Sequence, residues 1–268
     1  MPENSETTSV PSVIGDVLKR RVFALQDYTL LSVNAIKDIF TPPQYWADTL
    51  EQMDLIGVGS LPIVAIAAFF IGGVLVINTA SQFERFGMTA LTGDAVSLAL
   101  VRELGPSITA LLVAGRNASG IASELGSMVV TEQIDAMRAL GTDPIRKLVA
   151  PRVLATFFVL PLLVAVADFV GLIGGFSVSY LTLHVNGVQF WTRAIDALAL
   201  GDVVMGAIAK PLVFGLIIAT VGCYAGLRVR GGTQGVGRAT TNAVVISQMA
   251  VIVSDLFITR VFLTLFNL

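Results

Sequence analysis

Five long apolar runs constrain the fold of this chain more than any other feature of its sequence. A helix needs about 20 apolar residues to cross the roughly 30 Å hydrocarbon core of a bilayer, and each run has that length. The runs cover about residues 55–82, 95–123, 153–183, 203–227 and 243–268. Backbone polar groups have no water to bind inside a bilayer, so we expect all five runs to be helical. The sequence therefore predicts an all-α integral membrane protein with five transmembrane helices.

Composition supports this class and excludes several others. Of the 268 residues, 54% are hydrophobic and 13% are charged, against about 25% charged in a typical soluble domain. Cys223 is the single cysteine and His184 the single histidine, which excludes an internal disulfide and a histidine-based metal cluster or triad. No GxxxxGK[ST] motif is present, and the glycine-rich loop 231–237 lacks its lysine. We expect no cofactor, no metal, no nucleic-acid partner and no catalytic site.

The segment before the first run divides into two parts. Residues 1–12 are polar and rich in Ser, Thr and Glu, and we expect them to be disordered. Residues 13–54 mix apolar and basic side chains, which is typical of amphipathic helices lying on a membrane surface. Pro42 and Pro43 break this region, and Tyr45 with Trp46 would anchor it at the interface. Residues 55–268 form the five-span domain.

The loops predict the orientation of the spans. Basic residues gather in one set of loops, and the other set holds only Arg85 and Arg193. The basic set contains Lys19, Arg20, Arg21, Lys37, Arg138, Arg146, Lys147, Arg152, Arg228, Arg230 and Arg238. Basic loops stay in the cytosol, so we expect a cytosolic N-terminus and a C-terminus on the outer side.

One cytosolic segment, residues 126–144 (GSMVVTEQIDAMRALGTDP), is amphipathic. Val130, Ile134, Met137 and Leu140 recur at helical spacing, while charged residues occupy the other faces. A short helix between two spans is placed to meet a cytosolic partner. An ordinary surface-lying linker helix accounts equally well for this pattern.

Charges inside the spans suggest a second site. Arg102, Glu103 and Lys210 lie seven or eight residues from the outer ends of their runs, or roughly 10 Å deep. Arg260 falls in the same outer layer. A polar ring above apolar walls suits a ligand with a charged head and apolar tails, but structural ion pairs between helices explain these charges equally well.

Two further charges, Asp168 and Asp255, fall near the middle of their runs. For both we favour hydrogen bonds between helices.

The segment LVRELGPSITALLVAGRNASGIASELGSMVVTEQIDAMRALGTDP, residues 100–144, resembles the signature of the MlaE/YrbE permeases. These are membrane subunits of MCE-associated ABC lipid transporters. The later GVGRATTNAVV, residues 235–245, and the span with Asp255 are also similar to that family. The resemblance runs from about Ile36 to the C-terminus.

The resemblance implies a multi-pass protein of the bacterial inner membrane with its C-terminus in the periplasm. It also implies a second permease copy, a cytosolic ABC ATPase dimer, a hexameric MCE-domain protein and phospholipid as substrate, with a STAS-domain protein as a further candidate partner. By similarity, Glu132, Gln133, Ile134 and Asp135, with Met137 beside them, lie on the helix that couples to the ATPase. Arg102, Glu103 and Lys210 match charged positions near the lipid cavity of the family.

Two other functions stay open on the sequence alone. A secondary transporter would use Glu103, Asp168 or Asp255 to carry protons or sodium, although five spans cannot divide into two equal repeats. A non-transporting subunit would anchor partner proteins in the membrane.

Overall fold

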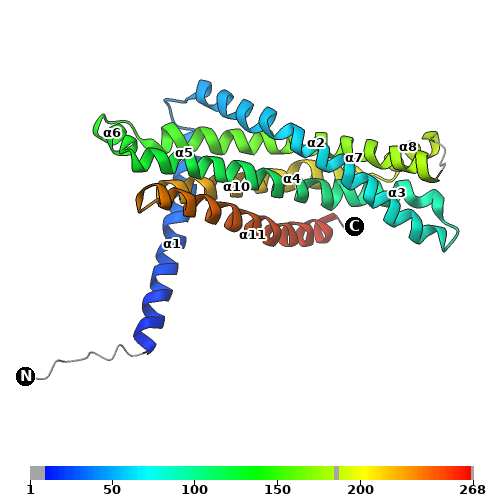
Figure 1. Cartoon of the computed structure of the whole chain (residues 1–268), viewed down its shortest axis with the longest axis horizontal. Coiled ribbons are helices and arrows are strands. Elements are labelled where there is room, and N and C mark those ends of the chain that lie inside the picture. The colour runs from blue at the N-terminus through cyan, green and yellow to red at the C-terminus, as the bar shows by residue number, and fades with distance from the viewer. Residues whose placement is uncertain (1–9, 184–186, 267–268) are drawn as a thin grey trace, which may run out of the picture.

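The computed structural model describes residues 10–183 and 187–266, and all regular structure in these ranges is helical (Figure 1). Five helical segments there are long and apolar enough to cross a membrane: Trp46–Glu84, Thr92–Val130, Ile145–Leu181, Leu200–Leu227 and Gly232–Phe262. The predicted all-α class and the five spans are therefore confirmed. Of the segment expected to be disordered, residues 1–9 lie outside the described ranges and residues 10–12 are helical.

Three of the five spans contain π-helical turns. The first span is α2 (Trp46–Glu84) and the fifth is α11 (Gly232–Phe266). The second follows a short 3-10 helix, η1 (Thr89–Leu91), and consists of α3 (Thr92–Ala99), the π-helical turn η2 (Leu100–Leu104), α4 (Gly105–Val113), the π-helical turn η3 (Ala114–Ala118) and α5 (Ser119–Val130). The third span consists of the π-helical turn η4 (Ile145–Val149) and α7 (Ala150–Leu183). The fourth span consists of α9 (Leu200–Val203), the π-helical turn η5 (Val204–Ala209) and α10 (Lys210–Leu227). Two short helices connect spans, α6 (Gln133–Ala139) at one end of the bundle and α8 (Gly187–Asp196) at the other (Figure 1).

Small residues allow the long helices to approach closely. A Cβ atom on Gly72 of α2 would overlap the carbonyl of Gly171 in α7, and one on Gly174 would overlap the carbonyl of Phe69. Glycines at such contacts bring helix backbones together, which gives membrane helices much of their van der Waals packing. The α2–α7 pair thus forms a rigid side of the bundle.

The helix of the first span begins before the apolar run. Residues 46–54 form the first turns of the continuous helix α2, and their expected position at the membrane surface stays a prediction. Pro43 is the last helix breaker before this segment, and the polar residues that follow it are compatible with a helix that extends beyond the bilayer. At 1.5 Å per residue, α2 is long enough to project well past a roughly 30 Å core.

The N-terminal helix α1 (Val10–Ile39) runs crosswise to the spans at the end of the bundle that carries α6 (Figure 1). It is held there by polar contacts to α10 and the loop after it. The Tyr28 hydroxyl and Thr220 Oγ1 lie 2.8 Å apart, the Tyr224 hydroxyl donates to the Ala24 carbonyl at 3.0 Å, and Arg228 pairs with Asp27. This course is the one that an interfacial helix would take, and the interfacial position stays a prediction.

Candidate functional site

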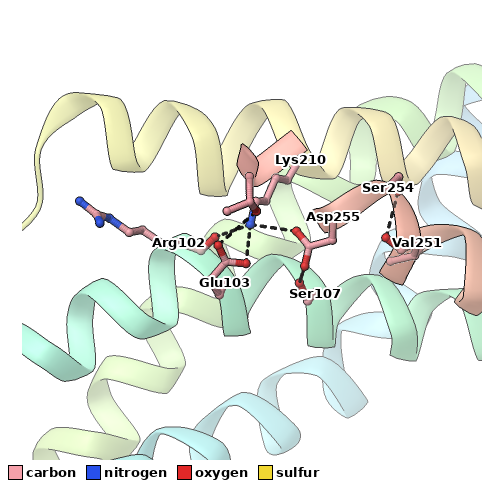
Figure 2. Close-up of polar contacts among 8 residues, drawn as sticks. Arg102, Glu103, Ser107, Lys210, Val251, Ser254 and Asp255 are labelled. Atoms are coloured by element: carbon pink, nitrogen blue, oxygen red, sulfur yellow. Dashed lines mark hydrogen bonds and ion pairs between the residues drawn. The ribbon is translucent and has the colours of Figure 1, made fainter. Parts of the chain in front are cut away.

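Lys210 is the centre of a polar cluster inside the bundle, and its side chain is fully buried. Its Nζ lies 2.6 Å from Glu103 Oε2 and 2.8 Å from the carbonyl oxygen of Arg102, both in η2 (Figure 2). Asp255 Oδ1 of α11 lies 2.8 Å from the same nitrogen, as an ion pair without a well-aligned hydrogen bond. The second, fourth and fifth spans therefore meet at one ammonium group.

The local sequence explains why a backbone carbonyl joins this cluster. In a regular α-helix the Arg102 carbonyl would accept the N–H of the residue four positions later, which is Pro106 and has none. The π-helical turn η2 ends just before this proline, at Leu104. Another π-helical turn, η5, directly precedes Lys210. Such turns occur frequently at functional sites, because they redirect side chains and carbonyls.

Hydroxyl groups donate hydrogen bonds to the two carboxylates of this cluster. Ser107 Oγ donates to Asp255 Oδ2 at 2.6 Å, and Thr259 Oγ1 donates to Glu103 Oε1 at 3.2 Å (Figure 2 shows the Ser107 contact). We call Lys210, Glu103, Asp255, Ser107 and Thr259 the Lys210 cluster. Three oxygens surround the ammonium and its side chain is 0% exposed, so a ligand cannot reach it in this conformation.

The Arg102 side chain leaves the cluster and makes a separate ion pair. In Figure 2 its guanidinium points away from Lys210. Its Nε lies 2.6 Å from Asp202 Oδ1, and Asp202 is 1% exposed. Asp202 Oδ2 also accepts the backbone N–H of Ala199 at 3.1 Å, at the start of α9. This pair therefore ties the second span to the beginning of the fourth.

The predicted coupling segment is shorter than expected. Residues 126–130 belong to α5, Thr131 and Glu132 form a turn, and α6 covers Gln133–Ala139. Glu132 has a φ of 59°, a left-handed conformation that is uncommon for a residue other than glycine. Such strain persists only where the surrounding structure imposes it.

Helix α6 is attached to the bundle by one face. Ile134 is 4% exposed and Met137 is partly buried, whereas Leu140, also expected on the apolar face, is 84% exposed. Asp135 pairs with Arg138 at 3.0 Å on the exposed side. The end of the bundle thus presents Glu132, Gln133, Asp135 and Leu140 to its surroundings.

Comparison with known proteins identifies the family. The sequence model named Permease MlaE matches residues 49–261, which is most of the chain. The chain belongs to the MlaE permease family.

Curated relatives carry matching names. A probable ABC transporter permease of Rickettsia typhi is 42% identical over 87% of this chain and 90% of its own length, and one from Synechocystis is 44% identical over 79% and 80%. The chloroplast protein TRIGALACTOSYLDIACYLGLYCEROL 1 of Arabidopsis thaliana is 37% identical over 81% of this chain and 62% of its own length. The family and the five apolar helices make this chain a multi-pass ABC transporter permease, which is a transport subunit by name rather than a catalyst.

In this MlaE-family permease, Arg260 does not join the residues expected beside it. Its side chain is exposed and has no ion-pair partner within the described ranges, while Thr259 occupies the cluster instead. Residues 255 and 259 are one helical turn apart and share a face, and residue 260 lies further round the helix. A lipid-binding role for Arg260 stays a prediction.

Sequence reasoning missed Asp202 and the carbonyl of Arg102. The pairing of Asp255 with Ser107 and Lys210 agrees with the expected bonding between helices. Asp168 does not show the expected bonding between helices, because its Oδ1 is buried without a hydrogen-bond partner and packs against Gly105.

Within the described residues, no group of three or more His, Cys, Asp or Glu side chains is placed to bind a metal.

Proposed function

We propose that this permease moves phospholipid between the bacterial inner membrane and the outer envelope, as the non-catalytic membrane subunit of an ABC transporter. The observation that carries the proposal is the Lys210 cluster, a buried ammonium shared by three spans of an MlaE-family permease. Charges inside membrane helices commonly mark a substrate pathway. The name of the Arabidopsis relative contains that of a diacylglycerol galactolipid, which supports a lipid substrate.

The enclosed ammonium supports a transport cycle with two states. In this conformation three protein oxygens surround Lys210 Nζ and the side chain is fully buried, so a lipid phosphate cannot reach it. When the second and fifth spans move apart, the ammonium loses one or both carboxylates and a phosphate replaces them. The two conformations then differ in lipid affinity, which is the requirement for a ligand to be bound in one state and expelled in the other.

The α6 end of the bundle is the proposed contact with the ATPase. Its exposed residues Glu132, Gln133 and Asp135 are free to meet a cytosolic partner, while Ile134 and Met137 attach the helix to the bundle. From α6 the second span runs through α5, η3 and α4 to η2, the turn that holds Arg102 and Glu103. A force on α6 is therefore transmitted along one continuous span to the Lys210 cluster.

The proposed assembly contains two permease copies, two ATPase subunits, a hexameric MCE-domain protein and a STAS-domain protein. Of the five span windows, the one in α11 is the least buried, at 11%, against 28–50% for the others. Its exposed apolar residues include Ile246, Met249, Val253 and Phe257. This exposed apolar face supports pairing with a second copy, which would cover it.

A proteoliposome assay tests the proposal. The permease is reconstituted with its ATPase, and transfer of fluorescent phospholipid to an acceptor is measured with and without ATP. We expect transfer that requires ATP and that decreases when Lys210 is replaced by Met. Transfer driven by a proton or sodium gradient without ATP would establish a secondary transporter. ATPase binding without any lipid movement would establish an anchoring subunit.

The ion-coupled alternative is favoured by one observation. Asp168 in α7 is 7% exposed, and its Oδ1 has no hydrogen-bond partner in the described structure. A lone carboxyl group inside a span is a candidate proton carrier. Replacement by Asn keeps its shape and removes its proton chemistry, so abolished transport in Asp168→Asn with normal ATP hydrolysis would favour ion coupling.

A further inference from the structure

Arg116 is a cation of the second span that lies outside the Lys210 cluster. It lies in the π-helical turn η3, with its guanidinium against α2. Nη1 donates to Ser60 Oγ at 3.0 Å and to the Leu55 carbonyl at 3.3 Å. Gly59 leaves the necessary space, because a Cβ atom there would overlap the guanidinium.

The charge of Arg116 is not balanced by a protein carboxylate. Within the described ranges no Asp or Glu oxygen lies within 4.0 Å of it, and its Nε and Nη2 make no hydrogen bond. The nearby Glu124 is already paired with Arg152, at 2.7 Å, and Arg152 is 4% exposed. Arg116 therefore keeps a positive charge and free donors, which suit an anionic ligand.

A groove lies beside this guanidinium between α2 and the second span. Its volume is about 280 Å³, and we call it the Arg116 groove. Its lining residues are Gln52, Leu55, Ile56, Arg116, Asn117, Gly120, Ile121 and Glu124. At Gly120 a Cβ atom would meet nothing within 4 Å, so the middle of the groove is open.

The same seam becomes apolar towards the Lys210 cluster. There a shallow depression between α2 and α4 is lined mainly by aliphatic side chains, including Val64, Ile71, Ile108 and Leu112. A cationic groove beside this apolar helix surface matches an amphiphile whose anionic head enters the groove and whose acyl tails lie along the surface. The second span covers Thr92–Val130, and Arg116 lies five residues, or roughly 8 Å, from its midpoint towards α6, which in the proposed orientation is the cytosolic half of the membrane.

We propose that the Arg116 groove binds the phosphate group of a phospholipid from the inner leaflet, with its acyl chains along the apolar seam. The planar guanidinium provides two parallel donors to a phosphate, which favours arginine at such sites. The site is separate from the Lys210 cluster and would receive lipid sideways from the bilayer. This inference rests on the proposed function for the orientation of the chain and the class of substrate.

Photo-cross-linking from Gln52 tests the site. The full chain, with a photoreactive residue at position 52, is placed in bilayers of phosphatidylglycerol and phosphatidylethanolamine, and cross-linked lipid is measured by mass spectrometry. We expect lipid adducts that fall about tenfold in Arg116→Gln and less in Arg116→Lys. Gly120→Trp, which fills the groove and keeps the charge, should decrease them as well. Arg85→Gln, which removes an exposed cation at the far end of α2, is the matched control and should leave them unchanged.

Three outcomes would overturn the proposal. Adduct levels that do not change in folded Arg116→Gln and Gly120→Trp would show that the groove does not select lipid. Adducts to a second copy of the chain would show that protein covers this surface. Competition by millimolar inorganic phosphate or glycerol phosphate would show a site for soluble anions.

The assay separates this site from the proposed function, because cross-linking requires no ATPase. Arg116-dependent adducts without ATP-driven transfer would refute only the function. Transfer without Arg116-dependent adducts would refute only this site.

Discussion

Lys210 Nζ lies 2.8 Å from Asp255 Oδ1 and joins the fourth span to the fifth in the bundle interior. Glu103 completes the arrangement from the second span, so one buried cation bridges carboxylates from two different helices. Such a group stabilises the conformation in which it is complete and opposes any other. The Lys210 cluster is therefore both a structural contact and the element that would change in a transport cycle.

Replacement of Lys210 by Met should strongly destabilise the folded protein. The substitution leaves Glu103 and Asp255 close together without a cation, and breaking a buried pair in this way costs about 3–5 kcal/mol. Thermal unfolding in detergent measures the effect. A triple variant that also carries Glu103→Gln and Asp255→Asn should recover part of the loss.

The matched control for this prediction is Lys147→Met. Lys147 pairs with Asp48 at a site where both side chains are about one-third exposed, and such pairs are worth about 0–1 kcal/mol. Equal destabilisation by the two lysine substitutions would contradict the central position assigned to Lys210.

Gly105→Ala should destabilise the contact between the second and third spans. Its new Cβ would overlap Asp168 Oδ1 and approach the Leu100 carbonyl to 3.0 Å, and overpacking of this kind typically costs about 1–3 kcal/mol. At Gly115, in the same span, the nearest atom to a new Cβ is Gln248 Nε2 at 3.9 Å. Gly115→Ala should therefore stay within about 0.5 kcal/mol of the parent in the same unfolding assay, and similar losses at both positions would be inconsistent with this packing.

Charge reversal on α6 should separate folding from coupling. Glu132→Lys with Asp135→Lys changes exposed side chains, so membrane insertion and thermal stability should stay near the parent values, while ATPase co-purification falls several-fold. Glu84→Lys, at the opposite end of the first span, serves as the control for a change of charge. Full ATPase recovery with the double variant would remove α6 from the docking surface.

Glu132→Gly isolates the backbone contribution at the same position. Glycine adopts a φ of 59° without strain, so this variant should be as stable as the parent or more stable by about 1 kcal/mol. Retained ATPase binding in Glu132→Gly would assign the role of this position to its turn, and lost binding would assign it to the carboxylate.

Cysteine labelling tests the orientation of the spans. Cys223 is fully buried, so it should not react with a membrane-impermeant maleimide. Phe86 is 74% exposed at one end of the bundle and Leu140 is 84% exposed at the other. With the outer membrane permeabilised, Phe86→Cys should react in otherwise intact cells, and Leu140→Cys only after the inner membrane is lysed. The reverse order would invert the topology.

The sequence predicted the spans because hydropathy alone decides which segments can cross a bilayer, and all five were found. Hydropathy did not indicate where the helix of the first span begins, since residues 46–54 mix charged and apolar side chains and only the continuous backbone of α2 shows that they extend it.

The candidate site could be predicted only in part. The depth of Glu103 and Lys210 along their helices brought them correctly to one level. Depth does not define which face of a helix a side chain occupies, so Arg260 was grouped with them although Thr259 makes the contact. Lys210 donates to the Arg102 carbonyl, and Asp202 pairs with the Arg102 side chain. Both contacts depend on the π-helical turns, which have no periodic signal in the sequence.

The most direct test of the account is ATP-driven phospholipid transfer by the reconstituted permease–ATPase complex. Transfer should require ATP and the α6 carboxylates, and the Lys210→Met variant should bind the ATPase but move lipid several-fold more slowly than the parent. Lipid transfer that proceeds at the same rate without ATP, or without the ATPase, would contradict the account.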